Sequence, residues 1–184
     1  MFGEGGKMAI SDASAKKYFK DRFITVDCIF INTQNKTFPN GKVVVLPEDE
    51  KEAKKKLADD VYARLQAGED FAALCTQYAD QSLEEDAAAN GYTFEKGGFL
   101  NAKAEEKAFE MAEGELARVD TDEGVYLLRR KALNMEYFAN ESAAIKALLK
   151  SVQKTAFITD SQDKFKLDEE FIESIDVSEI PHVV

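Results

Sequence analysis

The sequence is poor in the residues that bind metals or act as nucleophiles. Its 184 residues include one histidine, two cysteines, three prolines and no tryptophan. A closed structural zinc site needs about four Cys or His ligands, so we expect no metal site. There is no run of about 18 apolar residues, which excludes a membrane-spanning helix. The opening residues, MFGEGGKMAI, lack the apolar core and cleavage site of a secretory signal segment.

Basic residues are also in the minority. The chain has 35 acidic and 24 basic residues, a formal net charge of -11. Nucleic-acid binding depends on clustered Lys and Arg that neutralise phosphates, and here the basic residues are scattered. The one dense run, KEAKKK at 51–56, lies on a predicted helix that is rich in Asp, so we interpret it as a solvated face. GEGGKM lacks the spacing of a phosphate-binding loop. We therefore expect no nucleic acid and no cofactor.

What is present predicts one α+β domain with a helical tail. The chain is 45% hydrophobic, enough for a packed core. Alternating apolar residues predict strands at 23–32, 91–94, 116–121 and 125–130, with a hairpin-like insertion at 33–50. Helical spacing and capping residues predict helices at 11–22, 48–67, 70–78, 102–112 and 140–157. The remaining residues, up to 184, predict a helical turn and a short strand.

Side-chain periodicity assigns faces to these elements. On the first strand, Val26, Cys28 and Phe30 share one face, and Asp27, Ile29 and Ile31 share the other. On the last strand, Val125 and Leu127 face one side and Tyr126 and Leu128 the other. The helices bury apolar stripes, formed by Leu57, Val61 and Leu65 and by Phe71, Leu74, Cys75 and Tyr78. Gly68 suits the C′ position that ends the 48–67 helix.

A set of spaced motifs runs through the middle of the chain. A helix ends in Gly-x-Asp-Phe, the next ends in Tyr, and a Gly-Gly turn, an Ala-Phe pair and a Gly-Glu turn lead into two hairpin strands. The residues are Gly68, Asp70, Phe71, Tyr78, Gly97, Gly98, Ala108, Phe109, Gly114, Glu115 and Gly124. Together they resemble the parvulin-type peptidyl-prolyl isomerases over residues 24–131. The resemblance implies a small four-stranded antiparallel sheet flanked by helices.

The segment SDASAKKYFKDRF, directly before the first strand, resembles the linker helix of the PrsA-type and SurA-type extracytoplasmic foldases, and GYTF before the Gly-Gly turn is also similar to them. In these, a parvulin domain lies between two flanks that pack together as a chaperone module. The resemblance implies a linker helix at 1–22, a parvulin-like domain at 23–133, and the C-terminal helix and tail of the module at 134–184. It also implies an extracytoplasmic location and unfolded or proline-containing polypeptide clients. The apolar tail helix adds the expectation of self-association.

The resemblance also implies a site. Isomerising an X-Pro bond needs an apolar pocket for the ring and an environment that favours the twisted amide. Parvulins have two histidines on adjacent strands, a Cys or Asp after the Tyr helix, and a Met and a Phe that wall the pocket. The corresponding catalytic positions here are Cys28, Tyr126, and Gln81 or Asp80. The substrate-binding positions are Phe99 or Leu100, Ala104, Phe30 and Leu128. We expect Cys28 to face Tyr126 across the sheet.

Several alternatives stay open on the sequence alone. Cys28 could be a buried apolar residue, a reactive thiol, or half of a disulfide with Cys75. Tyr126 could be a strand tyrosine with a satisfied hydroxyl, or could contact peptide. With no histidine at the expected positions, we expect isomerase activity to be weak or lost. The alternative is a non-catalytic chaperone or assembly module on the same fold. An unrelated enzyme with Cys28 as nucleophile is disfavoured, because no base lies in sequence reach.

Overall fold

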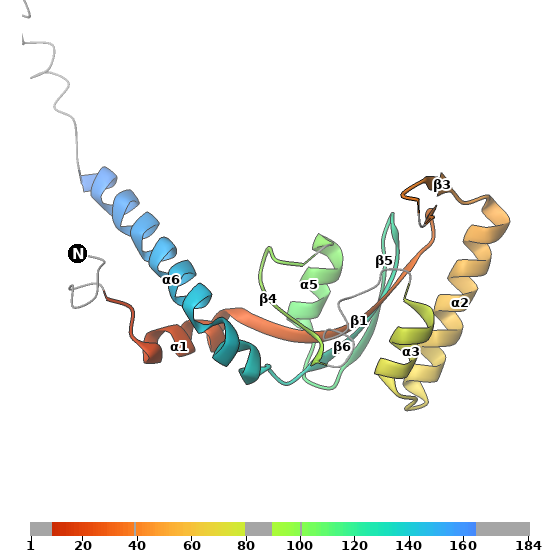
Figure 1. The fold of residues 1–184 in the computed structure, drawn as a ribbon, viewed down its shortest axis with the longest axis horizontal. Helices are drawn as coiled ribbons and strands as arrows, with labels where there is room; N and C mark the ends of the chain where they lie inside the picture. The colour runs from red at the N-terminus through yellow and green to blue at the C-terminus, as the bar shows by residue number, and fades with distance from the viewer. Residues whose placement is uncertain (1–8, 39, 80–89, 100, 165–184) are drawn as a thin grey trace, which may run out of the picture. The chain divides into compact units, whose positions relative to one another are not determined.

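Two strands far apart in the sequence form the centre of the fold (Figure 1). The computed structural model describes residues 9–38, 40–79, 90–99 and 101–164. The main sheet has the order β4-β1-β6-β5, and every pairing is antiparallel. Its strands are β1 (Phe23–Asn32), β4 (Tyr92–Glu95), β5 (Leu116–Asp120) and β6 (Gly124–Lys131). This confirms the predicted α+β class and the four-stranded antiparallel sheet.

The two faces of this sheet are covered by different helices. α2 (Glu48–Gln66) and α3 (Phe71–Tyr78) lie on one face, and α5 (Ala102–Glu110) lies on the other (Figure 1). Ile29, Ile31, Val125 and Leu127 pack on the α2/α3 face. Val26, Cys28, Phe30, Tyr126 and Leu128 pack on the α5 face. The alternation predicted from the sequence is confirmed on both central strands.

The helix boundaries follow from local capping. Gly68 has a φ of 90°, as expected for a glycine that ends α2 in the left-handed region. The side chain of Asp70 begins α3 by accepting a hydrogen bond from the backbone N–H of Ala73 at 2.8 Å. Asn101 caps α5 in the same way, accepting from the N–H groups of Lys103 and Ala104. The structure thus begins α3 and α5 at side-chain caps.

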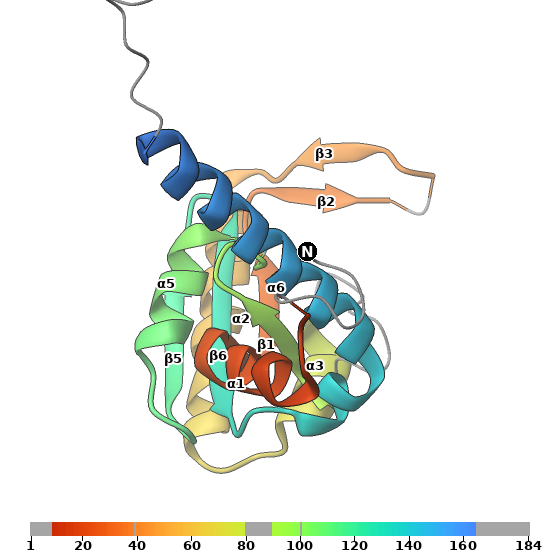
Figure 2. The ribbon, with the colours of Figure 1, turned by 90° about the vertical axis from the view of Figure 1, so that its left-hand side faces the viewer.

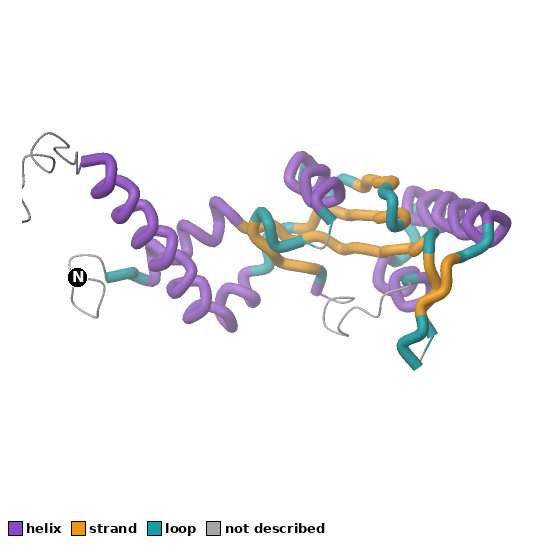
Figure 3. The backbone as a smooth tube through the Cα atoms, turned by 90° about the horizontal axis from the view of Figure 1, so that it is seen from above, coloured by secondary structure: helices purple, strands orange, loops and turns teal. Residues whose placement is uncertain are grey.

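The insertion at 33–50 forms a two-stranded hairpin, as predicted. β2 (Asn35–Thr37) pairs with β3 (Val43–Val45), and Gly41 at the turn has a φ of 79°. The hairpin extends away from the main sheet (Figures 2 and 3). Its base is held by Leu46, which is buried, and by the side chain of Asn32, which accepts from the N–H groups of Gln34 and Asn35.

The chain forms two compact units, and each of the two flanking helices belongs partly to one unit and partly to the other. One unit spans Lys16–Glu141, and the other combines Met1–Ala15 with Ser142–Val184. α1 (Asp12–Arg22) and α6 (Met135–Lys164) each contribute to both. Within the first unit, Phe19 of α1 packs against the rings of Tyr137 and Phe138. Within the second, Lys146 forms an ion pair with Asp12.

α6 is longer than the predicted helix at 140–157. It begins at Met135 because the side chain of Asn134 accepts hydrogen bonds from the N–H groups of Glu136 and Tyr137. Its backbone is non-helical at Glu141, with φ -103° and ψ 15°. The element predicted to begin at Asn140 is thus the part of α6 beyond a kink. The strand predicted near the C-terminus lies outside the described residues. None of the helices in the described part has the length and apolarity to cross a membrane.

Candidate functional site

Tyr126 lies at the centre of the α5 face, next to Phe30. The two residues are direct partners in the β1–β6 ladder, and their ring centroids are 4.5 Å apart. The direct partner of Cys28 is Leu128, so the prediction that Cys28 faces Tyr126 across the sheet is wrong. Alternation fixes the face that a side chain occupies but leaves its partner to the strand register. Cys28 does lie on the same face as Tyr126, two residues along β1 from Phe30.

Further aromatic side chains surround this pair. Phe99 stacks on Phe94 with ring centroids 4.7 Å apart, and its ring lies 6.1 Å from those of both Tyr92 and Tyr126. The group, called the ring cluster below, consists of Phe30, Tyr92, Phe94, Phe99, Phe109 and Tyr126. Phe30, Phe94 and Tyr126 are buried, whereas Tyr92, Phe99 and Phe109 are half-buried. The half-buried rings are therefore the part of the cluster that solvent reaches.

A buried carboxylate positions Phe99. Glu105 on α5 is 7% exposed, and its two oxygens accept hydrogen bonds from the N–H groups of Gly97 and Phe99 at 2.8 and 2.9 Å. The carboxylate thereby fixes the Gly-Gly turn from which Phe99 projects. Sequence reasoning missed Glu105, because its partners belong to the turn that precedes the helix and no local spacing pattern marks them. The signal available was an acidic residue in the first turn of a helix that begins a few residues after a glycine pair.

The expected catalytic positions on the sheet are electrically neutral. Burial, together with the nearby carboxylate of Glu123, raises the pKa of the Tyr126 phenol to about 12. Its hydroxyl donates a long hydrogen bond of 3.5 Å to Glu123 Oε2. Burial also raises the pKa of the Cys28 thiol well above its ordinary range. At neutral pH the Tyr126 phenol and the Cys28 thiol are therefore both protonated.

Burial and position also distinguish between the packing, reactive-thiol and disulfide interpretations of Cys28. Cys28 and Cys75 are both free and buried, and they belong to the clusters on opposite faces of the sheet. The Cys75 thiol donates to the backbone oxygen of Cys28 at 3.5 Å. A buried thiol with a raised pKa is a poor nucleophile. The structure favours the packing interpretation of Cys28 over the reactive thiol and the disulfide.

The other predicted site residues differ in their placement. Ala104 and Leu128 are fully buried on the α5 face, beside the ring cluster. Asp80, Gln81 and Leu100 lie outside the described residues. The structure thus brings together Cys28, Phe30, Phe99, Ala104, Tyr126 and Leu128 on one face. Within the described part of the chain, no group of three His, Cys, Asp or Glu side chains is arranged to hold a metal ion.

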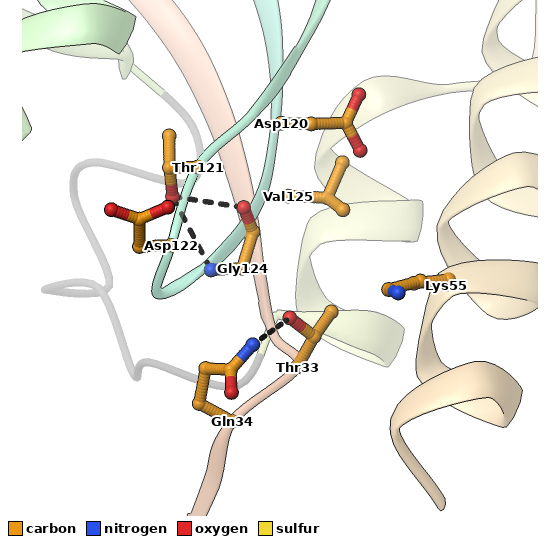
Figure 4. A pocket seen from close by; sticks show the side chains of 8 residues that line it. All are labelled: Thr33, Gln34, Lys55, Asp120, Thr121, Asp122, Gly124 and Val125. Carbon is orange, nitrogen blue, oxygen red and sulfur yellow. Dashed lines mark hydrogen bonds between the residues drawn. The ribbon is translucent and has the colours of Figure 1, made fainter. Parts of the chain in front are cut away.

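A separate polar cavity of about 580 Å³ lies at the end of the sheet (Figure 4). Its lining comes from the segment after β1, from α2 and from the β5–β6 turn: Thr33, Gln34, Lys55, Asp120, Thr121, Asp122, Gly124 and Val125. The Thr121 hydroxyl donates to the backbone oxygen of Gly124 at 2.9 Å, which closes the turn. None of the predicted site residues that the structure describes lines this cavity.

The family model of the PPIC-type PPIASE domain matches residues 8–133. The chain belongs to this family of peptidyl-prolyl isomerase domains. The curated foldase protein PrsA of Caldanaerobacter subterraneus subsp. tengcongensis is 30% identical over 113 residues. That match covers 61% of this chain and 37% of the relative, so the chain spans little more than a third of the relative's length.

Solved structures are similar at lower identity. PrsA of Bacillus subtilis is 18% identical with a TM-score of 0.45, and the match covers 95% of this chain and 59% of that one. The peptidyl-prolyl isomerase ESS1 of Candida albicans is 21% identical with a TM-score of 0.47, and the match covers 66% of this chain and 74% of that one.

Proposed function

We propose that this domain is a foldase module that binds unfolded or proline-containing polypeptide segments at the ring cluster, with weak or absent isomerase activity. The observation that carries the proposal is a set of half-buried rings that pack against the buried core of the α5 face. These are Tyr92, Phe99 and Phe109. An apolar aromatic surface of this kind suits the ring of a proline and the apolar side chains of unfolded chains. Family membership supports the peptide as the ligand class.

The chemistry of the cluster supports weak catalysis. The resemblance places histidines where Cys28 and Tyr126 stand, and both groups are neutral and buried here. The position expected to supply a phenylalanine wall is Ala104, which contributes one methyl group to the core. A smaller wall desolvates the proline less, so the twisted amide gains less stabilisation. The catalytic assignments to Cys28, Tyr126, Asp80 and Gln81 remain part of this proposal.

We also propose that the domain belongs to an extracytoplasmic foldase. The name of the Caldanaerobacter relative supports a role in folding other proteins. The pairing of Met1–Ala15 with Ser142–Val184 in one structural unit supports a module formed by the two flanks of the domain. Exposed apolar side chains on α6, including Leu148, Val152 and Phe157, offer that unit a surface for clients or for a second copy.

The test is NMR exchange spectroscopy on a short X-Pro peptide, with and without the protein, together with amide spectra of the protein. We expect little acceleration of cis–trans exchange, and shifts concentrated at the amides of Tyr92, Phe99 and Tyr126. Phe99→Ala should weaken binding about tenfold, since it removes a half-buried ring that the peptide would contact. Tyr62→Ala is the matched control, because Tyr62 is also a half-buried ring but packs on the α2/α3 face of the sheet.

Two outcomes would change the conclusion. Strong acceleration that Phe99→Ala abolishes would make the domain an efficient isomerase with an unusual cluster. Absence of any shift at the ring cluster, with client binding retained by α6, would favour the non-catalytic chaperone or assembly module. Sedimentation at several protein concentrations then decides whether α6 mediates self-association.

A further inference from the structure

The β2–β3 hairpin is the most exposed apolar feature of the domain. Val43 and Val45 are 59% and 68% exposed, and Val44 and Phe38 are about two-fifths exposed, at 39% and 41%. An exposed apolar edge strand of this kind can pair with a strand of another chain, and most proteins cover such an edge or place charged residues on it. The hairpin extends from the sheet, so both of its faces meet solvent (Figure 3).

The hydrogen-bond pattern shows which edge of the hairpin is free. The N–H of Phe38 donates to the oxygen of Lys42 at 2.9 Å, and the N–H of Leu46 donates to the oxygen of Gln34 at 2.7 Å. Hydrogen-bonded pairs alternate in an antiparallel ladder, so Val44 bonds to Lys36. The N–H and C=O groups of Val43 and Val45 therefore point away from β2.

The two edges differ. On the β2 side, Asn35 and Thr37 point outward, and the N–H of Asn35 is already bonded to the side chain of Asn32 at 2.8 Å, so this edge offers one N–H donor, that of Thr37. On the β3 side, the described residues supply no further strand. β3 thus offers an incoming chain two N–H donors and two C=O acceptors in the spacing of a strand, with valine side chains on both sides of the edge.

Charge indicates the kind of chain that fits. Residues 33–46 contain two lysines, Lys36 and Lys42, and no acidic residue, in a chain whose net charge is -11. The ammonium of Lys36 lies 5.5 Å from the centroid of the Phe38 ring, which keeps it over the apolar surface. A second hairpin would bring like charges together, whereas an acidic segment would be attracted.

We infer that the free edge of β3 binds extended, proline-free client segments in which acidic residues alternate with β-branched ones, by strand addition. This rests on the proposed foldase function and adds a second client surface to it. The ring cluster would hold proline-containing segments, and the hairpin would hold extended neighbours of the same unfolded chain. Main-chain hydrogen bonds supply most of the affinity in this mode, which suits a module with varied clients.

The experiment uses a short capped peptide in which valine alternates with glutamate and threonine, and a matched peptide with lysine in place of glutamate. Amide exchange of the wild-type protein is measured with and without each peptide. We expect the acidic peptide to slow exchange at Val43 and Val45, whose N–H groups face outward, and to leave Val44 unchanged. Weaker binding of the lysine peptide is expected from the charge of Lys36 and Lys42.

Two variants separate the backbone from the side chain. Val45→Pro removes an outward N–H and leaves the β2–β3 ladder intact, so it should weaken acidic-peptide binding about tenfold. Val45→Ala keeps the N–H and should weaken it only about twofold. Equal effects of the two variants, or unchanged exchange at Val43 and Val45, would overturn the inference. Shifts of β3 amides with protein concentration alone would assign the edge to a second copy instead. Proline-peptide shifts at Phe99 are read separately, so a failure here is distinguishable from failure of the ring-cluster proposal.

Discussion

The two faces of the sheet bury similar numbers of apolar side chains, but the side chains on the two faces differ in kind and in exposure. The α2/α3 face is mainly aliphatic at its centre, where Ile29, Ile31 and Leu127 have no exposed area. The α5 face is aromatic, and its outer rings remain half-buried. A close-packed aliphatic layer has little freedom to rearrange, whereas rings at an edge can shift to admit a ligand. One face thus serves stability, and the other is the better candidate for binding.

The largest expected effect compares adjacent residues of β6 on the two faces. Leu127 and Leu128 both have no exposed area, and they point to opposite sides. We expect Leu127→Ala to lower the free energy of unfolding by about 4 kcal/mol and Leu128→Ala by about 2.5 kcal/mol, since half-buried rings can partly fill the second cavity. Urea denaturation of both variants measures the difference. Equal losses would mean that the two faces are equally rigid.

The next comparison concerns the carboxylate on the α2/α3 face. Asp27 is 3% exposed and accepts from Arg129 Nε and Nη2 at 2.9 and 2.6 Å, while Lys131 Nζ lies 3.2 Å from its other oxygen. Asp27→Asn keeps the shape but removes the charge, so we expect a loss of about 2 kcal/mol in the free energy of unfolding. Peptide binding at the ring cluster should not change. Thermal unfolding and a peptide titration on the same variant check both expectations.

The matching carboxylate on the α5 face should behave differently. Glu105→Gln replaces one acceptor by a donor that faces the N–H of Gly97 or Phe99. We expect a loss of about 1.5 kcal/mol in stability and, because Phe99 is released, severalfold weaker proline-peptide binding. Asp27→Asn is the control for stability alone. If Glu105→Gln lowers stability but leaves binding intact, the carboxylate does not position the ring.

The smallest expected effect is a pH dependence of Tyr126. Its pKa is about 12 in the folded protein and 10.0 in its ordinary range, so the unfolded chain releases the proton first. The stability that this difference contributes is complete below the lower value and is lost as pH rises toward the higher one. We expect Tyr126→Phe to reduce the stability lost between neutral pH and pH 10.0 by about 0.4 kcal/mol, because at the lower value only the unfolded chain has begun to release this proton. Tyr18, whose pKa is also raised to about 12, contributes to the remaining loss, as do Tyr137, Cys28 and Cys75, whose pKa values burial raises.

The sequence predicted the layers of this fold better than their contacts. Alternation on β1 and β6 was enough to assign Ile29 and Leu127 to one face and Cys28 and Tyr126 to the other, because a strand has only two faces. It could not pair Tyr126 with Phe30, since a shift of two residues in register keeps every face unchanged. The helix was predicted to begin at Asn140 and not at Asn134, because both residues can cap a helix and the apolar spacing that predicted it begins only at Ile145.

The pairing of β1 with β6 has a consequence for how the chain is made. Residues 25–32 find their main partners at 124–131, so the central ladder cannot close until nearly the whole domain has left the ribosome. During that interval the apolar stretch FITVDCIFIN, which forms β1, has no β6 to pair with. While it is being synthesised, this chain exposes an extended, aggregation-prone segment of the kind that a foldase would bind in its client proteins.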